Sequence, residues 1–383
     1  MKLAVNTLLV SVGVLLALGM VMLYSSSMAD EVRNQQVGAH YLRQQLIWCS
    51  LGIVGGFAMT LLDYRALKKI TLPILAFATL LLVLVLIPHV GLKINGARRW
   101  FGFHGIRFQP SELAKIALII FIAWYGERYQ RQMNTLKQGV LIPGAFIAVV
   151  LGLIFVEPDR GSTILLAAVG AAMLLIAGVR WKYFVPPLVL ALVGLTVSIL
   201  RDPMRMKRIF SWLDLEQTKS GVGYQAYQAM LALGAGGWTG LGLGNGRQKL
   251  GFVPEHHTDF ILSIIGEELG FVATISVIAA FMIIVACGLY IAYHARDTFG
   301  LLLGAGITFL IGLQAFINIA VVTSVFPNKG LPLPFISYGG SNLLMMLVCV
   351  GVLLSIARQA REPADAPEHA AETDEIPGLQ TAQ

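Results

Sequence analysis

Ten long apolar runs follow one another along this 383-residue chain, and they limit its fold more than any other feature. A helix needs about 20 mostly apolar residues to cross a membrane, with a range of about 17–25. The runs occupy residues 7–28, 44–62, 71–90, 112–126, 139–156, 162–179, 184–200, 271–292, 299–322 and 341–357. The sequence therefore predicts an all-α, polytopic membrane protein with about ten transmembrane helices and both termini on one side.

The composition argues against a soluble globular protein. Only 13% of the residues are charged, and the mean hydropathy is +0.73, whereas soluble domains carry about 25% charged residues. The net charge is +7, but the Lys and Arg residues do not form the basic face of a soluble domain. No nucleic-acid partner is therefore expected. Cys49, Cys287 and Cys349 lie far apart inside apolar runs, which predicts neither a disulfide framework nor a cysteine metal site.

The chain divides into one membrane domain and a tail. Residues 1–361 hold all ten runs, and their largest non-spanning piece, 201–258, is expected to be a large extracytoplasmic loop between the seventh and eighth helices. The first run is longer than the apolar core of a signal peptide, so it is expected to stay as a membrane span. Residues 362–383 contain six acidic residues, three prolines and no Lys or Arg, a composition typical of a disordered tail.

The positions of Lys and Arg predict the orientation. With a cytoplasmic N-terminus, 12 of the 28 basic residues fall in short inner segments, as the positive-inside rule requires. Of the 16 that then face outward, five lie in residues 93–115 and seven in residues 201–249. Either the topology is inverted, or these outer cations bind an anion; the second interpretation predicts a cationic outer cavity.

The segment Arg107-Phe-Gln-Pro-Ser-Glu-Leu-Ala-Lys115 has the pattern of a helix start. Glu112 and Lys115 are three residues apart and share one helix face. They are interpreted either as a helix cap with a local ion pair or, together with Arg107, as a cationic site for a phosphorylated ligand. Ionisable groups at the edge of a span favour the functional interpretation.

Asp259 begins an unusually long helical pattern. Residues 259–293 would measure about 52 Å as a helix, while the hydrocarbon core is about 30 Å thick. Since residues 271–292 suffice to span, residues 259–270 are expected to line or cap an outer cavity. A carboxylate in such a cavity could act as a general base, although Asp259 could instead only cap the helix. The adjacent His256 and His257 have no spacing that predicts a zinc site.

Two further segments contain chemistry-bearing residues. Residues 327–341 hold three prolines and three glycines, so they cannot continue a helix and are expected either to line a cavity or to form a plain re-entrant connection. Lys329 could contact an anion there. Glu157 and Asp159 lie in a turn between two spans, where they could pair with cations or bind a divalent ion.

These segments together resemble the shape, elongation, division and sporulation family, which comprises FtsW, RodA and SpoVE. The matching stretches are NGARRWF (95–101), RFQPSELAK (107–115), EPDRGST (157–163), the long stretch 223–270 and PNKGLPLPFISYGGS (327–341). Among the members, GNGRQK, IIGEELG and the Lys-Gly of PNKG are more similar to FtsW than to RodA. The resemblance implies a ten-span fold and a peptidoglycan glycosyltransferase that polymerises lipid II at the outer face of the cytoplasmic (inner) membrane, in cell division more than in elongation.

The resemblance also implies roles for individual residues. Asp259 corresponds to the family's essential acid and is expected to act as the general base of an inverting transfer with undecaprenyl pyrophosphate as leaving group. Arg107, Lys115 and Lys329 would offset the charge on the pyrophosphate, and Glu112 would orient Lys115. The remaining predicted substrate-binding residues are Arg98, Arg247, Lys249, Glu255 and Ser337.

The same resemblance implies partners and one cofactor. A class B penicillin-binding transpeptidase and other divisome proteins are the expected partners, and a divalent cation (Mg²⁺ or Mn²⁺) could assist the leaving group, with no organic cofactor. The alternatives are a lipid II flippase, a RodA-type elongation polymerase, or a noncatalytic scaffold. A transporter predicts ionisable residues near mid-membrane and repeated halves, and the sequence has no clear inverted repeat.

Overall fold

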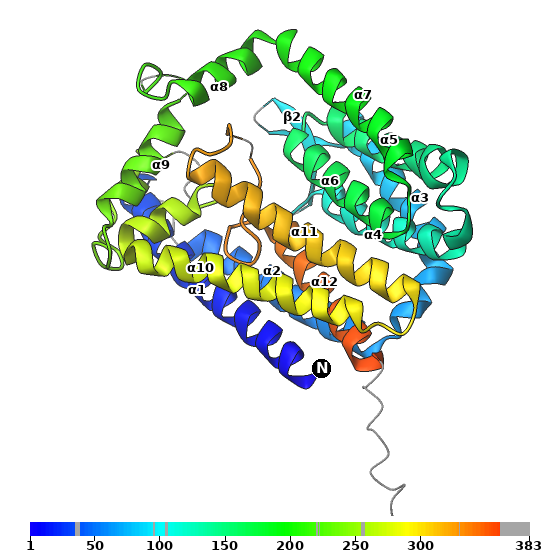
Figure 1. Cartoon of the computed structure of the whole chain (residues 1–383). Helices are drawn as coiled ribbons and strands as arrows, with labels where there is room; N and C mark the ends of the chain where they lie inside the picture. Colours follow the sequence, from blue (N-terminus) through cyan, green and yellow to red (C-terminus); the bar gives the residue numbers. More distant parts are fainter. Residues whose placement is uncertain are drawn as a thin grey trace, which may run out of the picture.

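The computed structural model describes residues 1–34, 39–94, 96–103, 106–219, 221, 223–253, 257–328 and 330–360. The predicted tail, 362–383, lies outside these residues. Long helices dominate the described chain and run side by side in one bundle (Figure 1). They are α1 (Lys2–Asn34), α2 (Ala39–Leu61), α3 (Leu67–Leu86), α4 (Pro110–Arg128), α5 (Ile142–Val156), α6 (Arg160–Ile176), α7 (Trp181–Leu200), α10 (Ile261–Tyr293), α11 (Thr298–Val322) and α12 (Gly340–Gln359).

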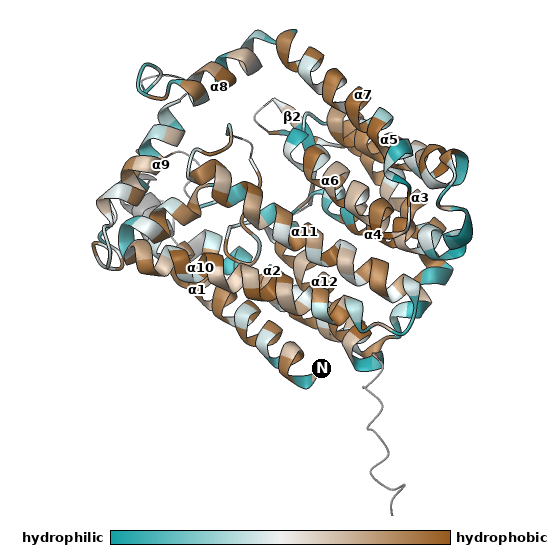
Figure 2. Cartoon of the chain, in the orientation of Figure 1, coloured by the Kyte–Doolittle hydropathy of each residue, from teal (hydrophilic) through white to brown (hydrophobic). Residues whose placement is uncertain are grey.

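These helices occupy the ten predicted ranges, and the predicted all-α polytopic membrane fold is confirmed. Within the described residues, eight helices are long and apolar enough to cross a membrane. The two others are α6, which is an apolar helix of 17 residues, and α4, which carries Glu112, Lys115 and Glu127. Apolar residues run along the helices and hydrophilic residues concentrate at their ends (Figure 2), as expected for a protein that crosses a lipid layer.

The bundle has two different ends. The helix α1 begins and α12 finishes at the same end, here called the terminal end (Figure 1). The opposite end, here called the loop end, carries the short helices α8 (Pro203–Leu213) and α9 (Tyr224–Ala235) and a small sheet. The predicted large loop 201–258 thus contains two helices and the 3-10 turn η4 (Gln248–Leu250).

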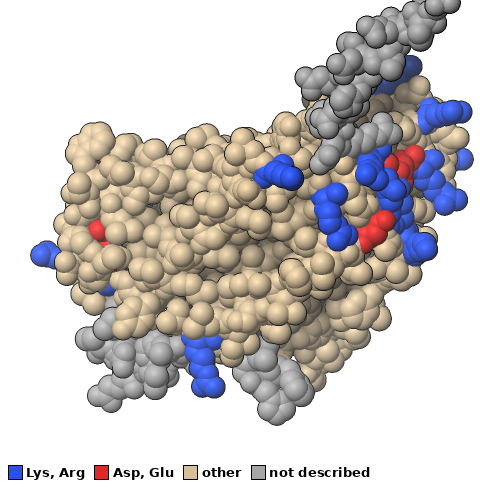
Figure 3. All heavy atoms as spheres, turned by 90° about the horizontal axis from the view of Figure 1, so that it is seen from below, with Lys and Arg blue, Asp and Glu red and all other residues tan. Residues whose placement is uncertain are grey.

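An ion-pair network closes the terminal end. Asp297, just before α11, accepts hydrogen bonds from Tyr64 Oη (2.9 Å), Arg65 Nε (3.1 Å) and Lys68 Nζ (3.1 Å). Lys68 also pairs with Glu127 at 2.8 Å, so the network joins α3, α4 and α11. On the face seen in Figure 3, most Lys and Arg side chains gather toward one end, and the middle of the molecule is largely uncharged.

A three-stranded antiparallel sheet, which the sequence prediction did not include, lies between α3 and α4. Its strands β1 (Leu92–Ile94), β2 (Ala97–Phe103) and β3 (Ile106–Phe108) pair in chain order, with Leu92 opposite Trp100 and Phe101 opposite Phe108. The sequence Asn95-Gly96 between β1 and β2 is a strong hairpin signal, and Gly96 has the positive φ (81°) that such a turn requires. The sheet adds to the fold class without changing it.

The helix α10 breaks at Gly270, where the backbone is not helical (φ 80°, ψ −173°). Its first part, from Ile261, therefore ends where the sequence predicted the change from a loop-end segment to a spanning segment. Gly270 is needed because this φ lies in a region that L side chains rarely adopt, and because a Cβ there would lie 2.3 Å from the Gly240 nitrogen.

Candidate active site at the loop end

Asp259 lies in a short turn before α10, and hydrogen bonds hold the backbone of this turn at three successive carbonyl oxygens. His257 O accepts from Tyr338 N (2.9 Å) and Thr258 O accepts from Ser337 Oγ (2.6 Å). Asp259 O accepts from the Asn318 side-chain amide (2.8 Å). The donors belong to α11 and to residues 331–339, so the turn is fixed against the proline- and glycine-rich stretch 327–341.

The Asp259 carboxylate packs over Gly330. A Cβ atom on Gly330 would come within 2.6 Å of Asp259 Oδ2, so the absence of a side chain at residue 330 makes room for the carboxylate. Asp259 is half-buried, so part of the residue is accessible. A partly accessible carboxylate on a fixed backbone has the geometry that a general base needs.

Aromatic side chains surround the same turn. The His257 ring stacks on Tyr41 with centroids 4.7 Å apart and meets the edge of Tyr338 at 5.9 Å. Tyr338 donates a hydrogen bond to Gln44, and burial raises the pKa of the Tyr338 phenol. The sequence prediction missed Tyr41, Tyr338 and Asn318, because nothing in the chain order indicates that α2 and α11 meet at Asp259.

Lys115 and Glu112 are buried inside the bundle. The Lys115 side chain is 1% exposed, and its Nζ lies 2.8 Å from Glu112 Oε2 and 3.3 Å from Gln314 Oε1. Asn342 of α12 donates to the same Glu112 oxygen (2.9 Å). Gln314 in turn donates to Pro332 O (3.0 Å), so the buried pair is connected to the segment that holds Asp259.

The two predicted arginines lie on the sheet. Arg107 is in β3 opposite Gly102, and Arg98 is in β2 opposite Lys93. Arg107 is exposed and close enough to Tyr338 to lower the pKa of that phenol, an effect smaller than that of burial. Arg107 is therefore a predicted cation that is exposed and lies near the turn that contains Asp259.

Two buried carboxylates hold the glycine-rich run 234–246. Glu267 accepts hydrogen bonds from Arg247 N (2.8 Å) and from Gln248 N. Glu268 pairs with Lys249 Nζ (2.6 Å) and accepts from Gly244 N (3.0 Å) and Ser25 Oγ (2.8 Å). The sequence left open whether this run approaches a ligand or forms a surface loop.

The structure shows that the glycine-rich run packs directly on α10. Leu241 N and Gly242 N donate to the carbonyls of Glu267 and Glu268 (both 3.0 Å). A Cβ on Gly246 would lie 2.9 Å from oxygens of both carboxylates. Lys249, for which the sequence predicted substrate contact, is only 5% exposed, and its ammonium makes an internal ion pair.

The turn between α5 and α6 holds a further buried carboxylate. Glu157 is 0% exposed, neither of its carboxylate oxygens has a hydrogen-bond partner among the described residues, and burial together with nearby Asp159 raises its pKa to about 8. Arg99 of β2 donates to Glu157 O (2.8 Å) and Pro158 O (2.5 Å), while Asp159 caps α6 through Ser162 N (3.0 Å).

The described part of the chain offers no three-ligand set for the predicted divalent cation, because no three His, Cys, Asp or Glu side chains come together there. Two other predicted site residues, Glu255 and Lys329, lie outside the described residues. Ser337 bonds the turn that contains Asp259 at Thr258 O, and Gln314 connects Glu112 and Lys115 to the segment of Ser337 through Pro332 O.

Comparison with known proteins gives one consistent family. The family model FTSW_RODA_SPOVE, described as "Cell cycle protein", matches residues 6–362. A probable peptidoglycan glycosyltransferase FtsW of Trichlorobacter lovleyi is 43% identical over 350 residues, which are 91% of this chain and 92% of the relative. Stage V sporulation protein E of Bacillus subtilis is 35% identical over 347 residues, 91% of this chain and 95% of the relative.

Solved structures share the fold. A chain solved under the heading "Structural coordination of polymerization and crosslinking by a peptidoglycan synthase complex" has a TM-score of 0.74 and 27% identity, with coverage of 92% of this chain and 96% of that chain. The rod shape determining protein RodA of Thermus thermophilus has a TM-score of 0.67 and 26% identity, with coverage of 93% and 97%. The chain therefore belongs to the FtsW/RodA/SpoVE family.

Proposed function

We propose that this protein is a peptidoglycan glycosyltransferase of the FtsW type, which polymerises lipid II into glycan strands during cell division. The names of the FtsW relatives support the activity and the division role. The observation that carries the proposal is the Asp259 carboxylate, which packs over Gly330 in a turn whose three carbonyl oxygens accept hydrogen bonds at the loop end.

In the proposed reaction, Asp259 takes the proton from a sugar hydroxyl of the acceptor. The oxygen then attacks the anomeric carbon of the donor, and the bond to undecaprenyl pyrophosphate breaks with inversion. The leaving group keeps the bonding electron pair as negative charge, so cations near it lower the barrier. Arg107 is exposed and can contact the pyrophosphate directly, and Arg98 lies in the neighbouring strand.

Lys115 is proposed to act from inside the bundle. Its ammonium is paired with Glu112 and bonded to Gln314, so it positions Gln314, which in turn fixes the Pro332 carbonyl. A Mg²⁺ or Mn²⁺ ion would supply Lewis-acid assistance to the leaving group. Since the described residues offer no three-ligand set for it, the mechanism proposed for Asp259 and Arg107 does not depend on its position.

The loop end is proposed to face outward across the cytoplasmic membrane, with both termini in the cytoplasm. The basic residues of the short segments at the terminal end, such as Arg65, Lys68 and Arg358, support this orientation through the positive-inside rule. A class B penicillin-binding transpeptidase is the proposed partner, because the similar chain of TM-score 0.74 was solved in work on a peptidoglycan synthase complex.

The decisive experiment reconstitutes the full chain with its transpeptidase partner and labelled lipid II. Wild type should form glycan strands, and Asp259→Asn, which keeps the side-chain shape but lacks the base, should form none while still binding the partner. Asp214→Asn is the matched control, because Asp214 is an exposed residue after α8. Normal polymerisation by Asp259→Asn would overturn the proposed base.

A parallel assay distinguishes the flippase alternative. Lipid II is placed in the inner leaflet of sealed vesicles, and its appearance at the outer surface is followed with the same variants. Transport by both wild type and Asp259→Asn, with no strands from either, would replace the proposed transferase by a flippase. Orientation is tested with Lys219→Cys, which a membrane-impermeant thiol reagent should label only from outside the cell.

A further inference from the structure

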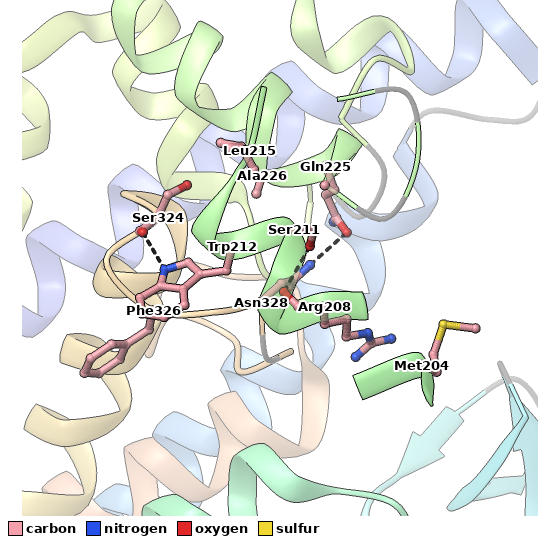
Figure 4. Close-up of a pocket in the computed structure, with 11 residues that line it drawn as sticks. Met204, Arg208, Ser211, Trp212, Leu215, Gln225, Ala226, Ser324, Phe326 and Asn328 are labelled. Carbon is pink, nitrogen blue, oxygen red and sulfur yellow. Dashed lines mark hydrogen bonds between the residues drawn. The ribbon is translucent and has the colours of Figure 1, made fainter. Parts of the chain in front are cut away.

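A pocket of about 260 Å³ lies at the loop end, between the loop 201–258 and the segment that follows α11 (Figure 4). Arg208 and Trp212 come from α8, Gln225 comes from α9, and Phe326 and Asn328 come from the segment after α11. The walls of the pocket therefore come from segments that are far apart in the sequence. Its volume is below the range of about 300–1,000 Å³ for drug-sized ligands, so it suits one ring-sized group.

Two hydrogen bonds join the walls of this pocket. Trp212 Nε1 donates to Ser324 O (2.9 Å), and Asn328 Nδ2 donates to Gln225 Oε1 (3.2 Å). The first bond fixes the orientation of the indole ring, and the second joins two side-chain amides across the pocket. Figure 4 shows both bonds as dashed lines that join the loop 201–258 to the segment after α11.

The pocket is next to the candidate base. Asn328 lines the pocket, and Gly330 contacts the Asp259 carboxylate. Two residues along a chain separate their Cα atoms by at most about 7.6 Å, because consecutive Cα atoms are about 3.8 Å apart. A group held in the pocket is therefore near enough to belong to the same substrate as the group that meets Asp259.

The lining fits a sugar. The C–H face of a pyranose ring packs on an aromatic ring such as Trp212, whose amphipathic indole suits a partly wet site. The amides of Gln225 and Asn328 can exchange hydrogen bonds with hydroxyl and N-acetyl groups. Arg208 provides a guanidinium that can bind a carboxylate in two-pronged geometry, and acidic groups are present on the peptide side of a muramyl sugar.

We propose that this pocket, lined by Arg208, Trp212, Gln225, Phe326 and Asn328, is a saccharide subsite that holds an N-acetylated sugar of the growing strand beside Asp259. This inference rests on the proposed function, and it adds a second contact to the site. A polymerase that binds the strand at a second point, next to the reacting bond, retains the strand between successive additions. The pocket thus contributes to strand length.

A direct binding test uses the full chain in lipid nanodiscs, with chitobiose (two N-acetylglucosamine units) as the probe. Saturation-transfer NMR should show binding of chitobiose and much weaker binding of cellobiose, which lacks the N-acetyl groups. Trp212→Ala should weaken chitobiose binding about tenfold or more, as for an aromatic side chain that carries much of the binding energy of a site, and Trp212→Phe should retain most of it. The control is Trp238→Ala, because Trp238 is 72% exposed and does not line the pocket.

A second measurement compares the strands made from labelled lipid II with the transpeptidase partner. Trp212→Ala should make shorter strands than wild type, and Trp238→Ala should make strands of wild-type length. If Trp212→Ala fails to fold, Gln225→Leu replaces it with the same expectation. Unchanged chitobiose binding or unchanged strand length in the pocket variant overturns the subsite. Chitobiose binding by a wild-type protein that makes no strands overturns the proposed function and supports the subsite.

Discussion

The Oδ2 atom of Asp259 lies 2.6 Å from the position that a Cβ atom on Gly330 would occupy, which is closer than the 3.0 Å that real Cβ contacts reach. A side chain at residue 330 must therefore displace the carboxylate. Because a carboxylate at the end of a side chain moves easily, the displacement costs the fold little. The reaction is more sensitive, since a misplacement of about 1 Å can lower a catalytic rate about 100-fold.

We therefore expect Gly330→Ala to lower kcat/KM for strand formation by about 10- to 100-fold with little change in the temperature of unfolding. Polymerisation and thermal unfolding are measured on the same preparation. Gly234→Ala is the control, because a Cβ on that glycine of α9 meets nothing within 4 Å. Wild-type activity in Gly330→Ala would show that the position of the carboxylate over Gly330 is not needed.

The buried pair between Lys249 and Glu268 should stabilise the loop end. Its N–O distance is 2.6 Å, and both side chains are almost fully buried. Lys249→Met leaves the Glu268 charge uncompensated, and breaking such a pair costs about 3–5 kcal/mol. We expect a clear fall in the free energy of unfolding, measured by denaturant titration in detergent.

A double variant separates charge from packing in this pair. Lys249→Met/Glu268→Gln should recover part of the lost stability, because the lone buried carboxylate is gone. Lys207→Met, which changes an exposed lysine of α8, should leave stability within about 0.5 kcal/mol of wild type. A single variant as stable as wild type would mean that Lys249 is not held by Glu268.

Some of the site could be predicted from the sequence because its signals are local. The apolar runs gave the helices, and the helix-start pattern at Gln109-Pro110 together with the spacing of Glu112 and Lys115 gave their ion pair. The position of Asn318 at Asp259 could not be predicted, because it depends on how α11 packs against the turn. A buried amide in an apolar helix was the available signal, since such a group must find a partner.

The same limit explains why the sequence prediction treated Lys249 as a substrate contact. Counting charges by loop assigns Lys249 to the outer surface, but Glu268 lies 19 residues later in an apolar stretch and takes its ammonium inside. A buried Glu in an apolar run predicts a buried cation somewhere, yet it does not say which one. Only the fold of the glycine-rich run on α10 identifies Lys249.

Asp297 should stabilise the terminal end through its charge. Burial alone would raise the pKa of this carboxyl, but the Gly300 N–H and the Lys68 ammonium outweigh burial and hold the pKa below its usual range. Asp297→Asn keeps a side chain that can cap α11 and removes only the charge. We expect it to lower stability by about 1 kcal/mol at neutral pH, the scale of a partly exposed ion pair.

The pH dependence of Asp297→Asn follows from the sign of the shift. A lowered pKa contributes stability above the unfolded value, and this stability is lost as the pH falls through the folded pKa. The difference in unfolding temperature between wild type and Asp297→Asn should therefore shrink below about pH 4. Asp214→Asn is the control, because Asp214 is an exposed residue after α8, at the opposite end of the bundle. A difference that stays constant at low pH would rule out the charge.

Glu157 should make the protein less stable as the pH rises. Its pKa is raised from 4.5 to about 8, first by burial and then by Asp159. The folded state therefore holds a proton that the unfolded chain releases at lower pH. The stability that this bound proton contributes is fully present below about pH 4.5 and is lost as the pH rises through about 8.

Glu157→Gln should remove this dependence, because the amide stays neutral. Thermal unfolding of wild type and Glu157→Gln is compared between about pH 5 and pH 9, a range that brackets the titration of the folded carboxyl. The wild-type unfolding temperature should fall relative to that of the variant by an amount equivalent to roughly 1–4 kcal/mol. Since the amide still needs hydrogen bonds, the informative quantity is the change with pH rather than the difference at one pH. Glu216→Gln, at an exposed position, should follow wild type throughout, and parallel curves for wild type and Glu157→Gln would show that Glu157 is already ionised in the folded protein.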